Sequence, residues 1–317
     1  MHIRLLGTAA GGGFPQWNCH CPTCHVARTD PARARTRTQS SVAVSADGER
    51  WFLLNASPDI RAQLATLPIP APTLAPSEAA PAAPAPTSHG VRRVPFEAIV
   101  LTDAELDHTL GLALVRECRE LRLYATGAIR DVLEADSRLL PLLRSFATVS
   151  LHPLSIGSRA ELLLGNGTPS GLTVEAIPLA GHAPRFSTVT APGVNCALIV
   201  RDSAGSSMAY VPCCAAIDGP LRESLATVRV LLFDGTFWSD RELIDLGISD
   251  RTATEMGHAP VGGAEGSLET LSGFTWCDRV FVHINNSNPM LVEDSPERRQ
   301  VESAGFQVGF DGMELVC

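Results

Sequence analysis

The stretch that decides the fold runs from Phe96 to Leu112 and reads FEAIVLTDAELDHTLGL. It begins with a short apolar run typical of a buried strand, and polar residues follow at once. Four side chains that can bind a metal fall within six positions there: Asp103, Glu105, Asp107 and His108. Because a strand holds the loop after it rigidly, such a loop can direct several ligands at one ion. An acidic first turn of a helix, favoured by the helix dipole, is the alternative interpretation.

Three later apolar runs end in the same way. AIPLAGH ends at His182, VLLFD ends at Asp234, and VFVH ends at His283. A single histidine after a strand is usually a core residue. Four strand ends in chain order that all carry Asp, Glu or His are much harder to obtain by chance. The sequence therefore predicts that these strand ends meet around a metal ion.

Short apolar runs alternate with helix-like stretches along the chain, which indicates a layered α/β protein. Ser41–Ser45 and Trp51–Asn55 flank an Asp-Gly pair and predict a β-hairpin. A helix is expected over Leu110–Cys118. Further strands are expected at Leu121–Ala125, Thr173–Leu179, Cys196–Arg201, Met208–Pro212, Val228–Phe233 and Arg279–His283. We expect an αββα sandwich, in which two mixed sheets face each other and helices cover their outer faces.

The composition is that of a globular protein, since 45% of the 317 residues are hydrophobic and 19% are charged. The formal net charge of −9 argues against a nucleic-acid partner, because phosphate contacts need clustered cations. No apolar run reaches the ~18 residues of a membrane span and no secretory signal is evident, so we expect a cytoplasmic protein without a membrane partner. We expect one domain over 1–317 with a Pro/Ala-rich loop insertion at 68–95, either a solvated surface loop or a lid.

Three of the nine cysteines stand together in the run NCHCPTCH, and we call them the cysteine knuckle: Cys19, Cys21 and Cys24. Three thiolates so close can surround one soft ion, whereas a disulfide between them would be strained. The spacing predicts a structural zinc site, with a redox pair as the alternative. The fourth ligand stays open between His20, His25 and a distant residue. We expect the other six cysteines to be core or incidental thiols.

The four strand ends together resemble the metallo-β-lactamase fold family. The metal loop of that family reads His-x-His-x-Asp-His, and single His, Asp and His ligands follow on later strand ends. The resemblance covers most of the chain outside the proline-rich insertion. It implies that Asp107, His108 and His283 bind an active-site metal. It also implies that Asp234 is the bridging carboxylate and that His182 is the remnant of the family's first metal site.

Asp103 and Glu105 stand where the family has its first two histidines. The first metal site has therefore lost two imidazoles, and we expect it to be weak or empty. The intact set of Asp107, His108 and His283 provides two imidazoles and one carboxylate. Such a set is associated with non-haem Fe²⁺ and open coordination positions, although Zn²⁺ also accepts these ligands. The pattern therefore indicates a preference for iron and not the identity of the metal.

Motifs spread over residues 7–289 resemble the pyrroloquinoline quinone biosynthesis protein B family more closely. They are GTAAGGGFPQWNCHCPTC, NASPDIR, DAELDH, FDGTFW, MGHAPV and HINNSNP. The resemblance implies a cytoplasmic step in making pyrroloquinoline quinone (PQQ). It implies an iron-dependent, oxygen-using hydroxylase that acts on the tyrosine ring of a Glu–Tyr-derived precursor. The alternatives are a non-catalytic carrier that helps to export the quinone and a metal-dependent hydrolase of the wider fold family.

On the hydroxylase hypothesis, Arg61 and Arg185 bind the carboxylates of the substrate, because a guanidinium group offers a planar pair of donors. His258 lies in a glycine-flanked loop and could transfer a proton beside the metal. We also count Asp103 and Glu105 as candidate catalytic groups. The expected partners are O₂ and a small dipeptide-like substrate, and we allow for a homodimer.

Overall fold

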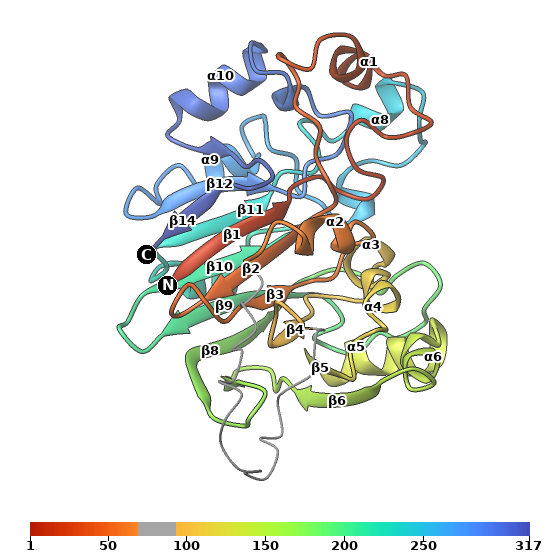
Figure 1. The fold of residues 1–317 in the computed structure, drawn as a ribbon. Helices are drawn as coiled ribbons and strands as arrows, with labels where there is room; N and C mark the ends of the chain where they lie inside the picture. Colours follow the sequence, from red (N-terminus) through yellow and green to blue (C-terminus); the bar gives the residue numbers. More distant parts are fainter. Residues whose placement is uncertain (69–92) are drawn as a thin grey trace, which may run out of the picture.

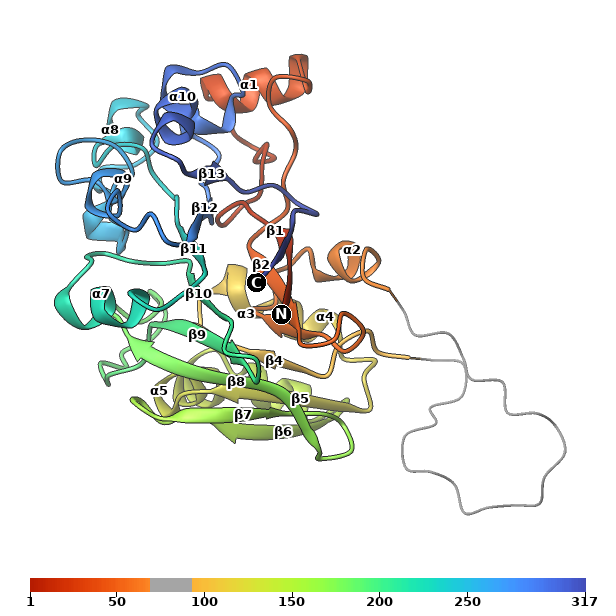
Figure 2. The ribbon, with the colours of Figure 1, turned by 90° about the vertical axis from the view of Figure 1, so that its left-hand side faces the viewer.

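The computed structural model describes residues 1–68 and 93–317, and two seven-stranded sheets that lie face to face form its centre (Figure 1, Figure 2). The first sheet has the order β14 (Glu314–Val316), β1 (His2–Gly7), β2 (Ser41–Ser45), β3 (Phe52–Leu54), β4 (Ala98–Val100), β5 (Glu120–Ala125) and β6 (Thr148–Pro153). The second has the order β13 (Gln307–Val308), β12 (Asp278–Val282), β11 (Val230–Asp234), β10 (Ser207–Val211), β9 (Cys196–Asp202), β8 (Pro169–Pro178) and β7 (Arg159–Leu163). The predicted αββα sandwich is confirmed.

Helices cover the outer face of each sheet. Those on the first sheet include α2 (Ile60–Leu64), α3 (Leu106–Thr109), α4 (Gly111–Leu114), α5 (Gly127–Asp131), which continues as the π-helix η1 (Val132–Asp136), and α6 (Leu139–Leu143). Those on the second include α1 (Pro22–Thr29), α7 (Gly219–Leu225), α8 (Glu242–Asp245), α9 (Ser267–Thr270) and α10 (Pro296–Ser303). The short 3₁₀ helices are η2 (Thr254–Met256) and η3 (Pro289–Leu291). Phe52, Leu198 and Tyr210 belong to the apolar core between the sheets, and a separate apolar cluster lies under each helical layer.

The strand directions bring the predicted ligand loops to one edge. In the second sheet β10, β11 and β12 run parallel, so the loops that follow them open side by side. In the first sheet β3, β4 and β5 are also parallel. Asp107, on α3 in the connection after β4, reaches His283, directly after β12, with 3.2 Å between Oδ2 and Nε2. The two sheets therefore contribute jointly to one site.

The predicted hairpin is confirmed, because β2 and β3 pair antiparallel. The helix expected over Leu110–Cys118 starts too late, since α3 begins four residues earlier and carries Asp107 and His108. The helix is interrupted between α3 and α4, and the backbone there passes close to the turn after β3. Gly111 permits this approach, because a Cβ at that position would clash with the carbonyl oxygen of Ser57.

Most of the Pro/Ala-rich insertion expected at 68–95 lies outside the described residues, so its interpretation as a surface loop or lid stays a prediction. Within the described ranges, none of the helices has both the length and the apolar character needed to cross a membrane.

Candidate metal centre

The buried carboxylate of Asp103, in the loop after β4, holds the imidazole of His108 on α3. Both oxygens of Asp103 lie 2.8 Å from Nδ1 of His108. The same carboxylate accepts hydrogen bonds from the hydroxyl of Thr102 and the backbone N–H of Glu105. His108 is fully buried, and its Nε2 has no hydrogen-bond partner among the residues that the structure describes. Because buried imidazole nitrogens normally have partners, Nε2 is the atom left to bind a metal.

Three carboxylates set the electrostatics around this imidazole. Burial alone would lower the pKa of His108, but the charges of Asp103 and Asp107 raise it to about 9. Burial would raise the pKa of Asp103, yet His108 holds it below its usual value. For Glu105, burial and the charges of Asp103 and Asp107 act together and raise the pKa to about 7. The site therefore concentrates negative charge that a cation would neutralise, and Glu105 can exchange a proton near neutral pH.

His283 approaches the same place from the second sheet. It directly follows β12 and has a φ of 54°, a conformation that is uncommon for a residue other than glycine. Its Nδ1 lies 2.8 Å from Oγ1 of Thr236, and its Nε2 lies 3.2 Å from Oδ2 of Asp107. Thr236 thus occupies one ring nitrogen of His283, and the other nitrogen faces the carboxylate from the first sheet.

Asp234, the last residue of β11, is fully buried and holds a third imidazole. Its Oδ2 lies 2.7 Å from Nδ1 of His258 and accepts the backbone N–H of Cys214 at 2.8 Å. Its Oδ1 accepts both the backbone N–H and the hydroxyl of Thr236. Burial would lower the pKa of His258, but the Asp234 charge raises it above its usual value. The His258 ring stacks on that of His283 with centroids 5.5 Å apart.

Donor atoms from these loops form two triads, each with its atoms within 4.8 Å of one another. The first triad is His108, Cys213 and His283, and the second is Asp234, His258 and His283. We use the name strand-end cluster for six residues: Asp107, His108, Cys213, Asp234, His258 and His283. Buried imidazoles, carboxylates and a thiol are the donors that transition metals prefer, so the set fits such an ion. On one side the N-terminal glycine loop closes the cluster, since a Cβ on Gly11 would lie 3.4 Å from Asp107 Oδ2.

The cysteine knuckle lies at the start of α1 and forms a second group of donors, with its three Sγ atoms within 4.8 Å of one another. Nδ2 of Asn286 lies 3.2, 3.6 and 3.3 Å from the Sγ atoms of Cys19, Cys21 and Cys24. His20 and His25 are exposed, so the loop after β12 supplies the fourth polar group instead. If the side-chain amide of Asn286 rotated by half a turn, its oxygen would face a cation bound by the three thiols. Three converging thiols fit the predicted zinc.

Comparison with known proteins decides the family. Residues 50–284 match the family model of the beta-lactamase superfamily domain. The coenzyme PQQ synthesis protein B of Methylobacterium radiotolerans is 42% identical over 325 aligned residues, which cover 99% of both chains. The protein of the same name from Methylococcus capsulatus is 40% identical and covers 100% of both chains. The chain belongs to the coenzyme PQQ synthesis protein B family.

Solved structures of this family and of its wider fold share the architecture of this chain. The crystal structure of Zn²⁺-bound PqqB from Methylobacterium extorquens superposes with a TM-score of 0.85 at 37% identity and covers 100% of both chains. A diphosphatase from the PhnP family has a TM-score of 0.65 at 20% identity, which shows the shared fold alone. The resemblance to the PQQ biosynthesis protein B family, and the metallo-β-lactamase fold that it implied, are confirmed.

His182 does not lie where the family pattern of the wider fold led us to expect it. β8 ends at Pro178, and His182 is exposed in the loop beyond, outside both triads. In this member of the PQQ synthesis protein B family, His258 occupies the place beside Asp234. The strand-end pattern failed here because three further residues separate the end of β8 from the histidine.

Arg61 on α2 and Arg185 in the loop after β8 are both exposed. Within the described ranges, neither guanidinium group forms a hydrogen bond or an ion pair with the strand-end cluster. Asp103 is a partner of His108, and Glu105 is half-buried beside it. The structure therefore brings the predicted acidic groups to the cluster, whereas the two arginines are exposed at the surface.

Cys213 belongs to the cluster although we expected an incidental thiol at this position. The sequence contained the signal, because the expected strand Met208–Pro212 ends directly before Cys213, as other strands end before His283 and the Asp103 loop. A thiol was the one ligand type that the strand-end pattern did not include.

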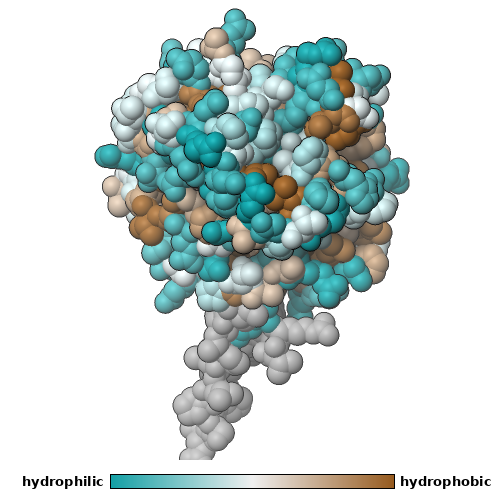
Figure 3. All heavy atoms as spheres, turned by 90° about the horizontal axis from the view of Figure 1, so that it is seen from above, coloured by the Kyte–Doolittle hydropathy of each residue, from teal (hydrophilic) through white to brown (hydrophobic). Residues whose placement is uncertain are grey.

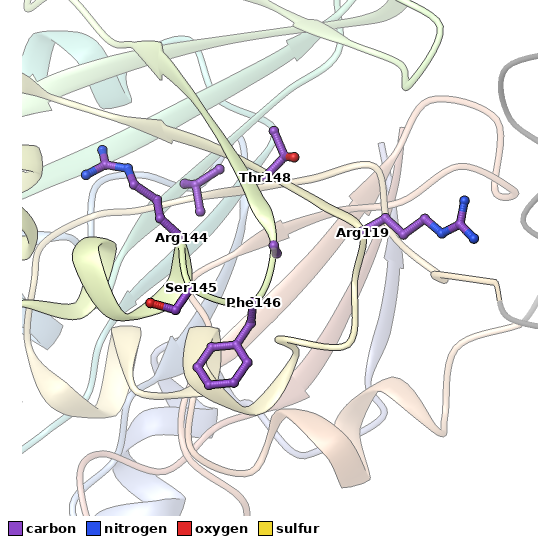
Figure 4. Close-up of a pocket in the computed structure, with 7 residues that line it drawn as sticks. Arg119, Arg144, Ser145, Phe146 and Thr148 are labelled. Atoms are coloured by element: carbon purple, nitrogen blue, oxygen red, sulfur yellow. The ribbon is translucent and has the colours of Figure 1, made fainter.

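Two of the hollows on the described surface lie away from the strand-end cluster, since none of its residues lines either of them. One of about 520 Å³ lies beside the cysteine knuckle, with Gln16, Leu243 and Ile248 in its wall. The other, of about 580 Å³, lies between α6 and β6, and Figure 4 shows the side chains of Arg119 and Arg144 pointing away from each other there. These arginines do not converge on one anion. Seen from the side of α1 and α10, the surface is mostly hydrophilic with small separate apolar patches (Figure 3).

Proposed function

We propose that this protein catalyses a metal-dependent, oxygen-using hydroxylation of the tyrosine ring of a Glu–Tyr-derived precursor during PQQ biosynthesis. The relatives that carry the name coenzyme PQQ synthesis protein B support the pathway. One observation carries the metal dependence: Nε2 of His108 is completely buried and lacks a partner in the described part of the chain. An imidazole held in this way is prepared to bind a metal ion.

The donor set supports a single catalytic ion. Asp107, His108 and His283 supply one carboxylate and two imidazoles, and open positions next to such a set suit iron and oxygen chemistry. Asp103 and Glu105, in place of imidazoles, do not make a second nitrogen-rich site. Asp103 is also occupied by its hydrogen bond to His108. We therefore propose Fe²⁺ at the strand-end cluster and Zn²⁺ at the cysteine knuckle.

The protein's own residues position the reaction. Asp103 and Thr236 each hold the Nδ1 atom of a ligand imidazole, which directs both Nε2 atoms inward. A redox-active ion held there would supply the oxygen activation that side chains cannot provide. Glu105, with a pKa of about 7, is a candidate to accept or return the proton of the phenol. His258 is the second candidate for proton transfer, because Asp234 holds its ring in place.

The overall reaction inserts one atom of O₂ into an aromatic C–H bond to give a phenol. The second oxygen atom leaves as water, with two electrons and two protons from a reductant. We propose that Arg61 and Arg185 pair with the carboxylates of the precursor, since both guanidinium groups are exposed and available. We place this step in the cytoplasm.

The test is anaerobic reconstitution with Fe²⁺, followed by addition of O₂ and the Glu–Tyr-derived substrate. We expect one O₂ consumed and one oxygen atom gained by the product, measured with an oxygen electrode and mass spectrometry. His108→Ala should abolish both signals, while His182→Ala, at an exposed histidine outside the cluster, should keep them.

Turnover of phosphodiesters by the zinc-loaded protein would favour a hydrolase instead. Binding of PQQ without any turnover would favour a carrier. Equal hydroxylation by the two histidine variants would overturn the proposed site.

A further inference from the structure

We propose that the thiol of Cys213 is a direct ligand of the active-site metal, so that the ion is held by a thiolate together with His108 and His283. This inference rests on the proposed metal site and names a donor that the two-imidazole, one-carboxylate pattern does not contain. It assigns a function to a residue for which the sequence predicted none.

The first support is position. Cys213 lies two residues beyond the end of β10, whose parallel neighbour β11 ends at Asp234. The donor atoms of Cys213, His108 and His283 all lie within 4.8 Å of one another. The backbone around the thiol is held on two sides. Asn195 donates to the carbonyl oxygen of Cys213 at 3.4 Å, and the N–H of the next residue donates to Asp234.

The second support is independent of the cysteine. His108 is fully buried, and its Nε2 has no hydrogen-bond partner among the described residues. Native structures rarely leave a buried nitrogen unpaired unless an ion or water completes it. The Sγ atom of Cys213 likewise takes part in no hydrogen bond within residues 1–68 and 93–317. Nε2 of His108 and Sγ of Cys213 can each bind a metal, and both lie beside His283. One metal ion would therefore complete both atoms at once.

The neighbouring Cys214 provides a contrast within the same dipeptide. Its Sγ donates to the carbonyl oxygen of Ala216 at 3.2 Å and belongs to the apolar cluster under the helices of the second sheet. That thiol is satisfied by the protein and is fully buried away from the strand-end cluster. The two thiols differ by one position in sequence and lie on opposite sides of the backbone, so Cys214 is a matched control.

Thiolate ligation has a defined chemical balance and a spectroscopic signature. The S–H bond breaks, the sulfur binds the ion, and the proton passes to solvent when the metal is loaded. A soft sulfur donor favours Fe²⁺, Co²⁺ and Zn²⁺ over Mn²⁺ and Mg²⁺. With Co²⁺, a sulfur ligand produces a charge-transfer absorption in the near ultraviolet that nitrogen and oxygen ligands do not produce.

The experiment uses the full chain with Zn²⁺ in the cysteine knuckle and adds Co²⁺ to the second site. We expect the native protein and Cys214→Ser to show the sulfur-to-cobalt absorption with stoichiometric binding. Cys213→Ser should lose the absorption and bind Co²⁺ at least about 10-fold more weakly, the scale seen when even an indirect partner of a ligand is removed. Circular dichroism and the melting temperature check that each variant folds.

The ligation of the metal by Cys213 can also be tested on the native chain, without any substitution. Alkylation followed by peptide mass spectrometry should modify Cys213 more slowly when Co²⁺ is bound. Stoichiometric Co²⁺ binding without the sulfur absorption, or unchanged affinity in Cys213→Ser, would overturn the thiolate ligand and leave the proposed metal site standing. If the native protein binds no second ion at all, both the ligand and the proposed function fail.

Discussion

The cysteine knuckle and the strand-end cluster are two candidate metal centres built in opposite ways. The knuckle takes its three thiols from Cys19–Cys24, and the chain needs only one local turn to bring them together. The strand-end cluster takes its donors from loops between Asp107 and His283, on both sheets. The first centre can exist wherever its short segment is ordered. The second exists only when the whole sandwich is assembled, and its imidazoles are fixed by partners that are themselves buried.

Because of this difference, we expect the knuckle to affect the stability of the protein and the strand-end cluster to affect its activity. An ion at the knuckle would tie the N-terminal segment to the loop after β12 through Asn286, which is a structural effect. An ion at the strand-end cluster would neutralise buried carboxylates whose charges already hold the pKa of His108 at about 9. Substitutions at the strand-end cluster should therefore remove its ion and leave the zinc of the knuckle in place.

The largest effect is expected for His283→Ala, which removes the imidazole shared by both triads. Turnover with Fe²⁺ should fall by more than about 100-fold, because loss of an indirect ligand partner alone costs 10- to 100-fold. The knuckle should keep its zinc, and elemental analysis should find one ion fewer per chain. His152→Ala, a histidine on β6 outside both triads, is the control. Loss of both ions in His283→Ala would contradict the separation.

The next effect is expected for Cys21→Ser. Loss of a knuckle ligand should release about one zinc per chain and lower the melting temperature by at least about 5 °C, because a structural metal contributes directly to folding. Differential scanning calorimetry and elemental analysis measure these quantities. Cys118→Ser, a buried thiol outside both centres, should keep its zinc. A Cys21→Ser protein with its full zinc content would refute the zinc assignment.

A moderate effect is expected for Asp103→Asn, which keeps the size of the side chain but removes its charge. The amide can donate to Nδ1 of His108 and so place the ring proton on Nε2, where it blocks a metal. We expect metal affinity at the strand-end cluster to fall about 10- to 100-fold. A competition titration with a chelating dye measures this, with exposed Asp131→Asn as the control. Unchanged affinity would mean that Asp103 does not orient the ligand.

The smallest effect on either centre is expected for Glu242→Gln, at the start of α8. Glu242 accepts hydrogen bonds from Ser287 and the backbone N–H of Trp238. Burial nonetheless raises its pKa to about 7 from a usual value of 4.5. Because the folded state then holds the proton more tightly than the unfolded state, stability should fall as pH rises from about 4.5 to 7.

The Gln variant should lose this decrease, worth about 3 kcal/mol, and should keep both ions. Urea unfolding at several pH values measures the slope, and Glu134→Gln, at a partly exposed carboxylate paired with Arg144, is the control. An equally steep slope in Glu242→Gln would assign the pH dependence to other groups.

The sequence predicted the parts of the fold that are fully buried. β4 and β11 are apolar runs apart from the final Asp234, β12 ends in the apolar run Val280–Val282, and the hairpin of β2 and β3 follows from its turn. The strands β6 and β7 were not predicted, because each is the edge strand of its sheet and mixes exposed and half-buried residues. Edge strands lack the continuous apolar run that marks a central strand.

The site was predictable to the extent that its ligands follow strands directly. Asp234 ends β11 and His283 directly follows β12, whereas Asp107 and His108 lie on α3 in the connection after β4. The structure brings all four together. Asn286 could not be assigned to the knuckle from the sequence, because its approach depends on the loop after β12 crossing to α1. Cys213 was missed for a different reason, because the strand-end pattern counted Asp, Glu and His but not a thiol. The fold places the end of β10 at the same edge as those of β11 and β12.

The loop after β12 serves both centres, with His283 at its start and Asn286 three residues later. Such sharing makes the order of metal loading matter. If zinc at the knuckle anchors this loop, a chain that meets iron first presents His283 on an unanchored segment. Zinc supply would then limit how much iron the protein retains, even in cells rich in iron. Protein produced in zinc-depleted medium should accordingly carry less iron than protein produced with both metals present.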